Sequence, residues 1–280
     1  MKEDNYQEVC EKKLEALTPD TLHKIKCLSS YNCQVRGDGA VFYLLGCGRF
    51  NTFKWDCGSK VKWQRLDEKS RIELPNRTLL EVQFVSELRG EGKGQYRHTS
   101  VYIIDALFLC GDDIRSLSFE KRQEKLQKFV KALRKTTRTD LIQLHMPEIF
   151  SMERVEQIFE RLVMRVGKSS ANKPRLCYKT DSGNFFCPTG MTIIQTVKEP
   201  WIRGHSKSTG LDYWYNIHNR RSVYECPADS IATARDCKLN SLHWSWTDGV
   251  KVHPDQKENG ATGLLDKEKF MDHIHKIRQQ

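Results

Sequence analysis

Residues 36 to 39 read Arg-Gly-Asp-Gly and place a cation directly before a tight, acidic turn. A side chain that forms a covalent bond to phosphorus must be able to lose its proton, as an amine does. Arginine cannot, because its pKa exceeds about 12 and its charge is delocalised over the guanidinium. Arg36 is therefore predicted to be no nucleophile. A simpler interpretation stays open, in which Asp38 and Gly39 only supply the geometry of a hairpin turn.

A second group of chemically useful residues lies between residues 198 and 231, where three short aromatic runs are separated by turn residues. This pattern is typical of a small three-stranded antiparallel sheet and predicts an independent module. Side chains alternate along a strand, so Tyr213 and Tyr215 are expected on one face, with Trp214 and Asn216 on the other. The module should therefore have two aromatic faces with different roles.

The first face is predicted to be a minute core, in which Trp214 packs with Trp201 and Pro227. The segment 198–231 resembles a WW domain, and this resemblance implies that Tyr213 and Tyr224, on the opposite face, form a groove that accepts proline in a polyproline II helix. A simpler interpretation is that the aromatics only hold together a sheet too small to be stable otherwise. That interpretation explains the core but leaves the two groove tyrosines without a purpose.

Polar residues beside the groove indicate what else the ligand carries. Ser222 and Tyr215 complete the predicted peptide-binding face, with Ser222 as a hydrogen-bonding group. The candidate phosphate-binding cations are Arg203, Lys207 and Arg221. Arg203 and Lys207 are expected on the first loop with His205 and Ser206, where the WW resemblance implies a site for a ligand phosphate. The predicted ligand is a Ser-Pro or Thr-Pro peptide, most simply a phosphorylated one.

The stretch YNCQVRGDGAVFYLL at 31–45 resembles the first motif of the mRNA-capping guanylyltransferases and their ligase relatives. Residues 77–85 and 100–126 resemble the two strands and the helix that follow in that family. The resemblance covers roughly residues 31–190 and implies a nucleotidyltransferase-like fold. In that family the motif lysine forms a phosphoramidate with the nucleotide, and Arg36 stands in its place.

Other positions depart from the same family. Val41 stands where the family has an arginine, and residues 81–83 read Glu-Val-Gln where Asp-Gly-Glu would contact the nucleotide. The fourth motif survives only as TDSGNFFCP at 180–188. These departures predict a fold retained after its chemistry was lost, and no catalytic residue is assigned. The competing hypothesis is a nucleotidyltransferase that uses a displaced lysine, Lys54 or Lys62.

Two further stretches resemble known patterns. LHWSW at 242–246 resembles the guanylyltransferase strand that carries two lysines around a Trp, with His243 and Ser245 in their places. The aromatic module would then be an insertion between two strands of one domain; a separate tail strand is the alternative. The segment 198–231 resembles a WW domain, with Tyr224 where the second Trp usually stands. That substitution predicts a shallower groove and weak binding.

The expected fold class is α+β, a curved antiparallel sheet with helices plus the small all-β WW module. The expected divisions are a helical N-terminal linker at 1–30, a degenerate guanylyltransferase-like domain at 31–195, a WW domain at 198–231, and a tail at 232–280. Five β-rich runs between residues 31 and 109 supply the sheet. Apolar periodicity predicts helices at 118–135 and at 151–166, the second capped by Ser151, and a final helix at 266–278.

The predicted helix at 118–135 has an apolar face and a dense basic face. The side chains expected inward are Phe119, Leu126, Phe129, Val130 and Leu133. Between residues 121 and 138 there are eight Lys or Arg against Glu124 alone, a local net charge of +7. Several cations on one face can bind RNA or an acidic tail. Such a run is also compatible with a solvated face that has no partner.

The net charge of the whole chain is +10 at 280 residues, which favours acidic partners such as nucleic acid or phosphorylated peptide. The ten cysteines come without a signal peptide or a Cys-x-x-Cys pair, so reduced thiols in cytosol or nucleus are expected. The nine histidines show no metal spacing. No apolar run approaches membrane-spanning length, so neither a metal site nor a membrane partner is expected.

A degenerate guanylyltransferase-like domain followed by a WW module resembles the C-terminal region of the animal cap 1 2'-O-ribose methyltransferases, over essentially the whole chain. The resemblance implies a fragment of a longer nuclear enzyme that uses S-adenosylmethionine in an upstream methyltransferase domain. The fragment itself is expected to hold no cofactor and to be non-catalytic. Its implied partners are the phosphorylated C-terminal repeats of RNA polymerase II, the methyltransferase domain, and capped RNA through the basic face at 121–138. An RNA-binding or still GTP-binding nucleotidyltransferase-like module is the alternative.

Overall fold

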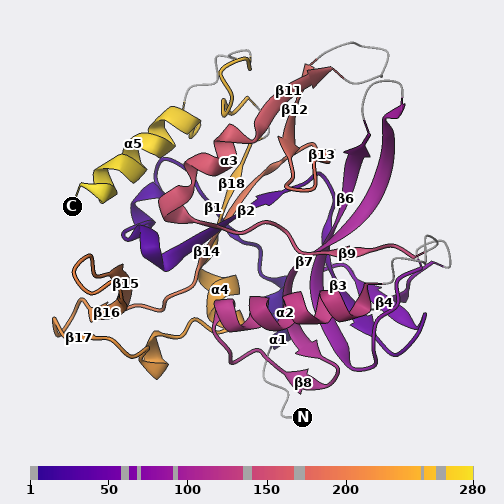
Figure 1. The fold of residues 1–280 in the computed structure, drawn as a ribbon, viewed down its shortest axis with the longest axis horizontal. Coiled ribbons are helices and arrows are strands. Elements are labelled where there is room, and N and C mark those ends of the chain that lie inside the picture. The colour runs from indigo at the N-terminus through magenta and orange to yellow at the C-terminus, as the bar shows by residue number, and fades with distance from the viewer. Residues whose placement is uncertain are drawn as a thin grey trace. The chain divides into compact units, whose positions relative to one another are not determined.

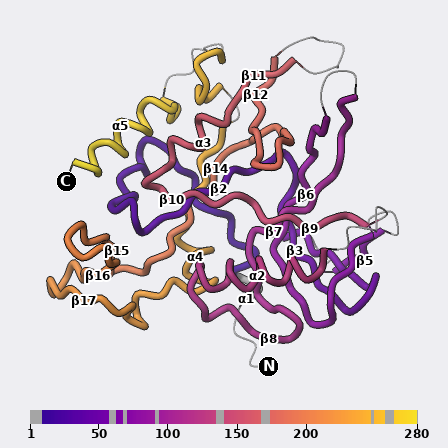
Figure 2. The backbone as a smooth tube through the Cα atoms, in the orientation of Figure 1, coloured from indigo at the N-terminus to yellow at the C-terminus, as the bar shows by residue number. Residues whose placement is uncertain are grey.

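A computed structural model describes residues 6–57, 63–67, 71–90, 94–134, 141–166, 174–246, 249–256 and 263–279. The chain divides into two compact units, each built from separate parts of the sequence. Unit 1 comprises Met1–Lys13, Gly37–Pro147 and Thr233–Lys238, and unit 2 comprises Leu14–Arg36, Glu148–Ala232 and Leu239–Gln280. By these bounds, successive segments of the sequence alternate between the two units. Figures 1 and 2 show the path of the chain.

Unit 1 is built on long antiparallel strands. Its elements are α1 (Tyr6–Glu11), β3 (Val41–Gly46), β4 (Thr52–Trp55), β5 (Gln64–Arg65), β6 (Thr78–Arg89), β7 (Tyr96–Leu109), β8 (Asp112–Asp113), α2 (Phe119–Leu133), β9 (Leu144–His145) and most of α4 (Ala234–Asn240). The strands follow the order β5-β4-β3-β6-β7, all antiparallel, and β9 adds in parallel to β7. The β6–β7 hairpin is the longest pair, and register shifts near Leu80 and Val82 interrupt its ladder.

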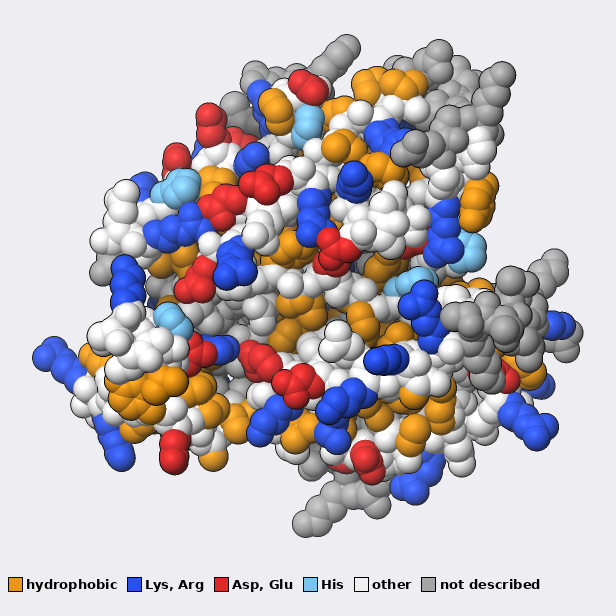
Figure 3. Space-filling model, in the orientation of Figure 1, with side chains coloured by type: hydrophobic (Ala, Val, Ile, Leu, Met, Phe, Trp, Pro, Cys, Tyr) orange, Lys and Arg blue, Asp and Glu red, His pale blue; other side chains and the backbone are white. Residues whose placement is uncertain are grey.

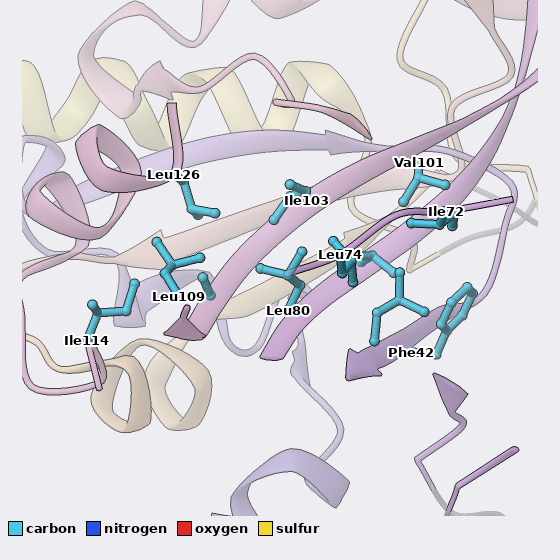
Figure 4. Close-up of a cluster of buried hydrophobic side chains, with 12 residues drawn as sticks. Phe42, Ile72, Leu74, Leu80, Val101, Ile103, Leu109, Ile114 and Leu126 are labelled. Atoms are coloured by element: carbon cyan, nitrogen blue, oxygen red, sulfur yellow. The ribbon is translucent and has the colours of Figure 1, made fainter. Parts of the chain in front are cut away.

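One apolar cluster holds unit 1 together (Figure 4). It takes side chains from β3, β6 and β7 and one turn of α2: Leu80, Val82, Val101, Ile103 and Leu126 are all fully buried. The predicted helix at 118–135 is confirmed as α2, with Ser118 capping its first turn through a hydrogen bond from the Lys121 amide. The helix forms because an apolar stripe on one side can be buried against β7.

Unit 2 is built on a shorter sheet in the order β1-β18-β14-β2-β10. Its elements are β1 (Glu15–Ala16), the 3-10 helices η1 (Leu22–Lys24), η2 (Leu28–Ser30), η4 (Met152–Arg154) and η5 (Ala228–Ser230), β2 (Tyr31–Arg36), β10 (Phe150–Ser151), α3 (Glu156–Glu160), β11 (Leu162–Val166), β12 (Pro174–Lys179), β13 (Phe185–Phe186), β14 (Gly190–Gln195), β15 (Trp201–His205), β16 (Asp212–Asn216), β17 (Ser222–Val223), β18 (Leu242–Ser245) and α5 (Lys267–Arg278). On one face of the sheet Trp244 stacks on Phe270 of α5, with ring centroids 4.6 Å apart. The predicted final helix is α5, which Asp266 caps.

The strands β15, β16 and β17 form a separate three-stranded antiparallel sheet, here called the aromatic module. It lies in the chain between β14 and β18, which pair with each other along Gly190–Ile193. Leu242–Ser245, within the stretch at 242–246, therefore forms a strand of the same sheet as β2 and β14 (Figure 1). The module is an insertion between neighbouring strands of that sheet.

Three expectations about the elements were wrong. Residues 151–166 do not form one helix: α3 ends at Glu160, and 162–166 form β11, paired with β12. Local apolar spacing allowed either state, and strand pairing decided for the β-branched part. Within the described part of residues 1–30, α1 covers only Tyr6–Glu11, and Glu15–Ala16 pairs with β18. The β-rich runs at 31–109 do not share one sheet, because β2 joins β14 and β10 in unit 2.

The structure is α+β, with mostly antiparallel sheets and few helices, as the sequence predicted at this level. No helix in the described part of the chain is long and apolar enough to cross a membrane. The described residues also contain no cluster of His, Cys, Asp and Glu that could bind a metal ion. All ten cysteines are free thiols.

Candidate functional site

Arg36 ends β2 and lies on a polar face of the unit 2 sheet. Arg36 is only 8 % exposed, and its Nε donates a hydrogen bond to Thr192 Oγ1 at 2.8 Å. Thr192, on β14, lies directly opposite His243 on β18, and the two side chains are 3.5 Å apart. The guanidinium of Arg36 is therefore held by the protein itself.

His243 cannot replace a family lysine as a cation at neutral pH. Burial, together with the charge of Arg36, lowers the pKa of His243 to about 4. The imidazole is neutral at pH 7 and contributes only hydrogen bonds. None of the three side chains that form this polar face, Arg36, Thr192 and His243, is an amine that could attack a phosphate.

The turn after Arg36 is held by the side chain of Gln83, in unit 1. Gln83 is the last residue of the Glu-Val-Gln stretch that stands where the guanylyltransferase resemblance would place Asp-Gly-Glu. Gln83 Nε2 donates to the carbonyls of Gly37 at 3.0 Å and Gly39 at 2.6 Å. Its Oε1 accepts from the Gly37 amide at 3.2 Å. A Cβ on Gly39 would lie 1.5 Å from the Phe84 carbonyl oxygen, so only glycine fits there. Gln83 is committed to the backbone of this turn.

Glu81, the acidic residue two positions before Gln83, is also bound to a partner within the protein. The carboxylate of Glu81, a residue 7 % exposed, is paired with Lys238. Lys54, one of the displaced nucleophiles considered, pairs with Asp56 at 3.5 Å and is partly exposed. The other, Lys62, lies outside the described residues.

The aromatic module has the two faces that alternation predicted. The register pairs Trp201 with Asn216 and Gly204 with Tyr213. Trp201 and Asn216 are buried at 7 % and 6 % exposure. Asn216 Oδ1 accepts from the amides of His218 and Asn219 and so shapes the turn that follows β16.

The core of the module includes an aspartate that sequence reasoning missed. Trp201 Nε1 donates to Asp229 Oδ2 at 2.9 Å, which ties the segment after Pro227 to the first strand. Pro227 is half-buried and precedes η5. Trp214 is half-buried on the same face as Trp201. Nothing in the sequence singles out Asp229, because its partner lies 28 positions earlier.

The opposite face carries the predicted groove residues. Tyr215 pairs with Ser222, and Tyr213 lies two positions before Tyr215 on the same face. Tyr224 follows β17 directly and is 58 % exposed. Tyr213 is half-buried because its ring lies across Gly204: an added Cβ there would be 2.5 Å from the ring. Gly204 is a second functional residue that sequence reasoning missed. Counting the strand register back from the first turn would have placed it opposite Tyr213.

The predicted phosphate-binding cations are not equivalent. Arg203 and His205 both lie in β15 and not on the first loop. Both side chains donate hydrogen bonds to the carboxylate of Asp212. The two hydrogen bonds lower the pKa of Asp212. Because Arg203 lies opposite Trp214 and is paired with a carboxylate, its charge is already balanced.

Lys207 and Arg221 are both exposed but lie at opposite ends of the module. Lys207 is in the β15–β16 loop with Ser206, and Arg221 is in the turn that leads into β17. The five residues of β16 separate these two turns. At about 3.4 Å per residue the backbone separation is about 17 Å, so the two cations lie beside different ends of the face.

The module is fixed to the rest of unit 2 by backbone and side-chain contacts. Ser29, in η2, donates its hydroxyl to the Arg203 carbonyl. Lys26 pairs with Glu199 at 3.3 Å, and Val197 forms a bridge with Ile231. Both ends of the module are thus attached while its tyrosine face includes an exposed ring.

Fold and sites together define an α+β protein of mostly antiparallel sheets, with a small aromatic sheet inserted between two paired strands. No family model matches the chain. It is homologous to one part of animal proteins named cap-specific mRNA (nucleoside-2'-O-)-methyltransferase 1, which confirms the resemblance drawn from its residues.

Three of these relatives show the extent of the similarity. The protein from Danio rerio is 39 % identical over 265 residues, which is 95 % of this chain and 32 % of the relative. The Homo sapiens protein is 40 % identical over 241 residues, 86 % of this chain and 28 % of the relative. The Drosophila melanogaster protein is 30 % identical over 195 residues. The chain spans about a third of the length of the curated relatives it matches, in their C-terminal part.

Proposed function

We propose that the chain is the non-catalytic C-terminal region of a cap-specific mRNA 2'-O-ribose methyltransferase, and that its aromatic module is a WW domain that recruits the enzyme to RNA polymerase II. The names of the relatives support the parent activity. The parent would methylate the first transcribed nucleotide with S-adenosylmethionine, in the nucleus, through a domain upstream of this chain.

The observation that carries the recruitment proposal is the tyrosine face of the module. The Tyr213 ring lies against Gly204, and Tyr224, directly after β17, is 58 % exposed. Two such rings on one face can enclose a proline, and Ser222 lies beside them to accept or donate a hydrogen bond. An exposed aromatic ring leaves apolar surface in contact with water, which is unfavourable, and a bound ligand would bury that surface.

The ligand proposed is a phosphorylated Ser-Pro repeat, as in the C-terminal domain of RNA polymerase II. Lys207 and Arg221 are exposed cations at the two ends of the face, whereas Arg203 would have to leave Asp212 to bind a phosphate. Lys207 is the stronger candidate, because Tyr213 lies next to the strand end that its loop joins.

A fluorescence titration of a two-repeat Ser-Pro peptide, with and without phosphate, tests the proposal on the 280-residue chain. Tyr224→Ala should weaken binding about tenfold, roughly 1.4 kcal/mol, as expected for loss of one stacking ring. Gly204→Ala should also weaken it, because the added methyl displaces the Tyr213 ring. Tyr96→Ala is the matched control, since Tyr96 is 57 % exposed and lies in unit 1.

The cations are tested in the same titration. Loss of the preference for phosphorylated peptide in Lys207→Ala, but not in Arg221→Ala, would assign the phosphate to the first loop. Equal affinities of wild type, Tyr224→Ala and Gly204→Ala would remove the groove from the proposal.

A further inference from the structure

The exposed side of α2 carries four lysines, Lys121, Lys125, Lys128 and Lys131, here called the lysine stripe. At 100° per residue these positions fall within about 120° of one another around the helix, and they extend over about 15 Å along it. Figure 3 shows Lys and Arg side chains gathered over α2, with acidic ones among them. The buried residues Phe119 and Leu126 fix the opposite side of the helix in unit 1, so the stripe must face solvent.

The stripe carries a net positive charge, although the exposed Glu124 lies within the same arc of the helix. None of its four lysines forms an ion pair with another residue in the part of the chain that the structure describes. Arg122, between them in sequence, behaves differently: it is buried and bound to Asp105. The helix therefore separates a structural cation from four that remain available to a partner.

We infer that the lysine stripe binds the phosphate backbone of RNA. Lysine ammonium groups act as compact point charges without the planar fork of arginine, which suits contact with successive phosphates and carries no base readout. The inference rests on the proposed function in one respect: the relatives modify mRNA, so RNA is the polyanion that the parent enzyme must hold. The stripe would lengthen the contact with the transcript independently of its sequence.

The expected signature is a steep salt dependence. Each phosphate neutralised on a single strand contributes about −0.7 to the slope of log affinity against log salt, so four contacts give a slope of about −3. Between 50 and 200 mM salt this slope corresponds to a loss of about 60-fold in affinity.

The test is fluorescence anisotropy of a labelled 20-nucleotide RNA of mixed sequence with the 280-residue chain at several KCl concentrations. The test variant changes the four lysines of the stripe to Gln. A charge-matched control changes four exposed lysines elsewhere: Lys12, Lys13, Lys179 and Lys276. The inference predicts that the stripe variant loses at least tenfold in affinity at 100 mM salt and most of the slope, while the control loses less than threefold.

Equal losses in the two variants would reduce the effect to net charge and overturn the inference, as would the absence of RNA binding by the wild type. A poly-glutamate of equal charge that displaces the RNA as effectively as unlabelled RNA does would overturn RNA as the partner. The phosphopeptide titration on the stripe variant separates the two proposals, because peptide binding through the aromatic module should be unchanged. Circular dichroism of both variants checks that they fold.

Discussion

Removal of the buried guanidinium of Arg122 is the sharpest perturbation that the structure offers. The side chain is 0 % exposed and pairs in a bidentate manner with Asp105: Nε lies 2.9 Å from Oδ1 and Nη2 lies 2.7 Å from Oδ2. Nη1 also donates to the Leu117 carbonyl at 2.7 Å. Burial alone would lower the pKa of Arg122, but Asp105 outweighs it and the net direction is upward. Each of the three guanidinium nitrogens thus donates a hydrogen bond within unit 1.

Arg122→Met keeps most of the side-chain volume but leaves the Asp105 carboxylate largely buried without its cation. Breaking a buried pair by removing one partner costs about 3–5 kcal/mol. The double variant Arg122→Met/Asp105→Asn should lose less stability than Arg122→Met alone, because it buries no unpaired charge. The side-chain oxygen of the asparagine can still accept the hydrogen bond that the Ala106 amide donates to Asp105 at 2.8 Å. Lys121→Met, an exposed neighbour on the same helix, should change stability by less than about 0.5 kcal/mol.

Urea unfolding followed by circular dichroism measures all three variants against the wild type. The reasoning fails if Arg122→Met costs less than about 1 kcal/mol, or if the double variant is no more stable than the single one. Either result would mean that the carboxylate finds another partner or reaches water when the guanidinium is absent.

Two further predictions concern the polar face of unit 2. The folded pKa of His243, about 4, lies below its ordinary value of 6.5, so the unfolded chain binds a proton that the folded chain does not, and stability should fall as the pH drops from about 6.5 to about 4. Over that pH window, the unfolding free energy of His243→Gln, measured by urea titration, should fall by up to about 3 kcal/mol less than that of the wild type. Identical pH profiles for the two proteins would contradict the lowered pKa of His243. Incubation with α-labelled GTP and Mg²⁺ should leave no covalent label on the wild type or on Arg36→Lys, since Gln83 and Glu81 are committed within the protein. A label that survives denaturation would show that the nucleotidyltransferase chemistry persists.

Local patterns were good guides where one segment decides its own structure. Apolar spacing predicted α2 and the final helix, α5, and alternation around Trp214 predicted both faces of the aromatic module. The same reasoning failed for 162–166, where pairing with β12 outweighed a helical pattern. Short apolar runs of this kind satisfy both periods, and only the partner strand distinguishes them.

Charge patterns were less reliable than apolar patterns. The basic pattern groups Arg122 with the exposed cations of its helix, although the structure buries it. Arg203 was placed on a loop, although it lies in a strand and is balanced by Asp212. A cation's role depends on which carboxylate reaches it, and that is a property of neighbours far away in the sequence.

The sequence by itself determined two features of this protein. Arginine at position 36 excludes an amine nucleophile at that position because of its pKa, and alternation along β16 assigns tyrosines and Trp214 to opposite faces. Only the tertiary structure decided that β14 and β18 pair across the inserted module, that Gln83 holds the turn after Arg36, and that Arg122 is internal while the lysines beside it are exposed. The physical reason is that side-chain chemistry and strand period are local, whereas pairing, burial and charge balance depend on segments that meet only when the chain folds.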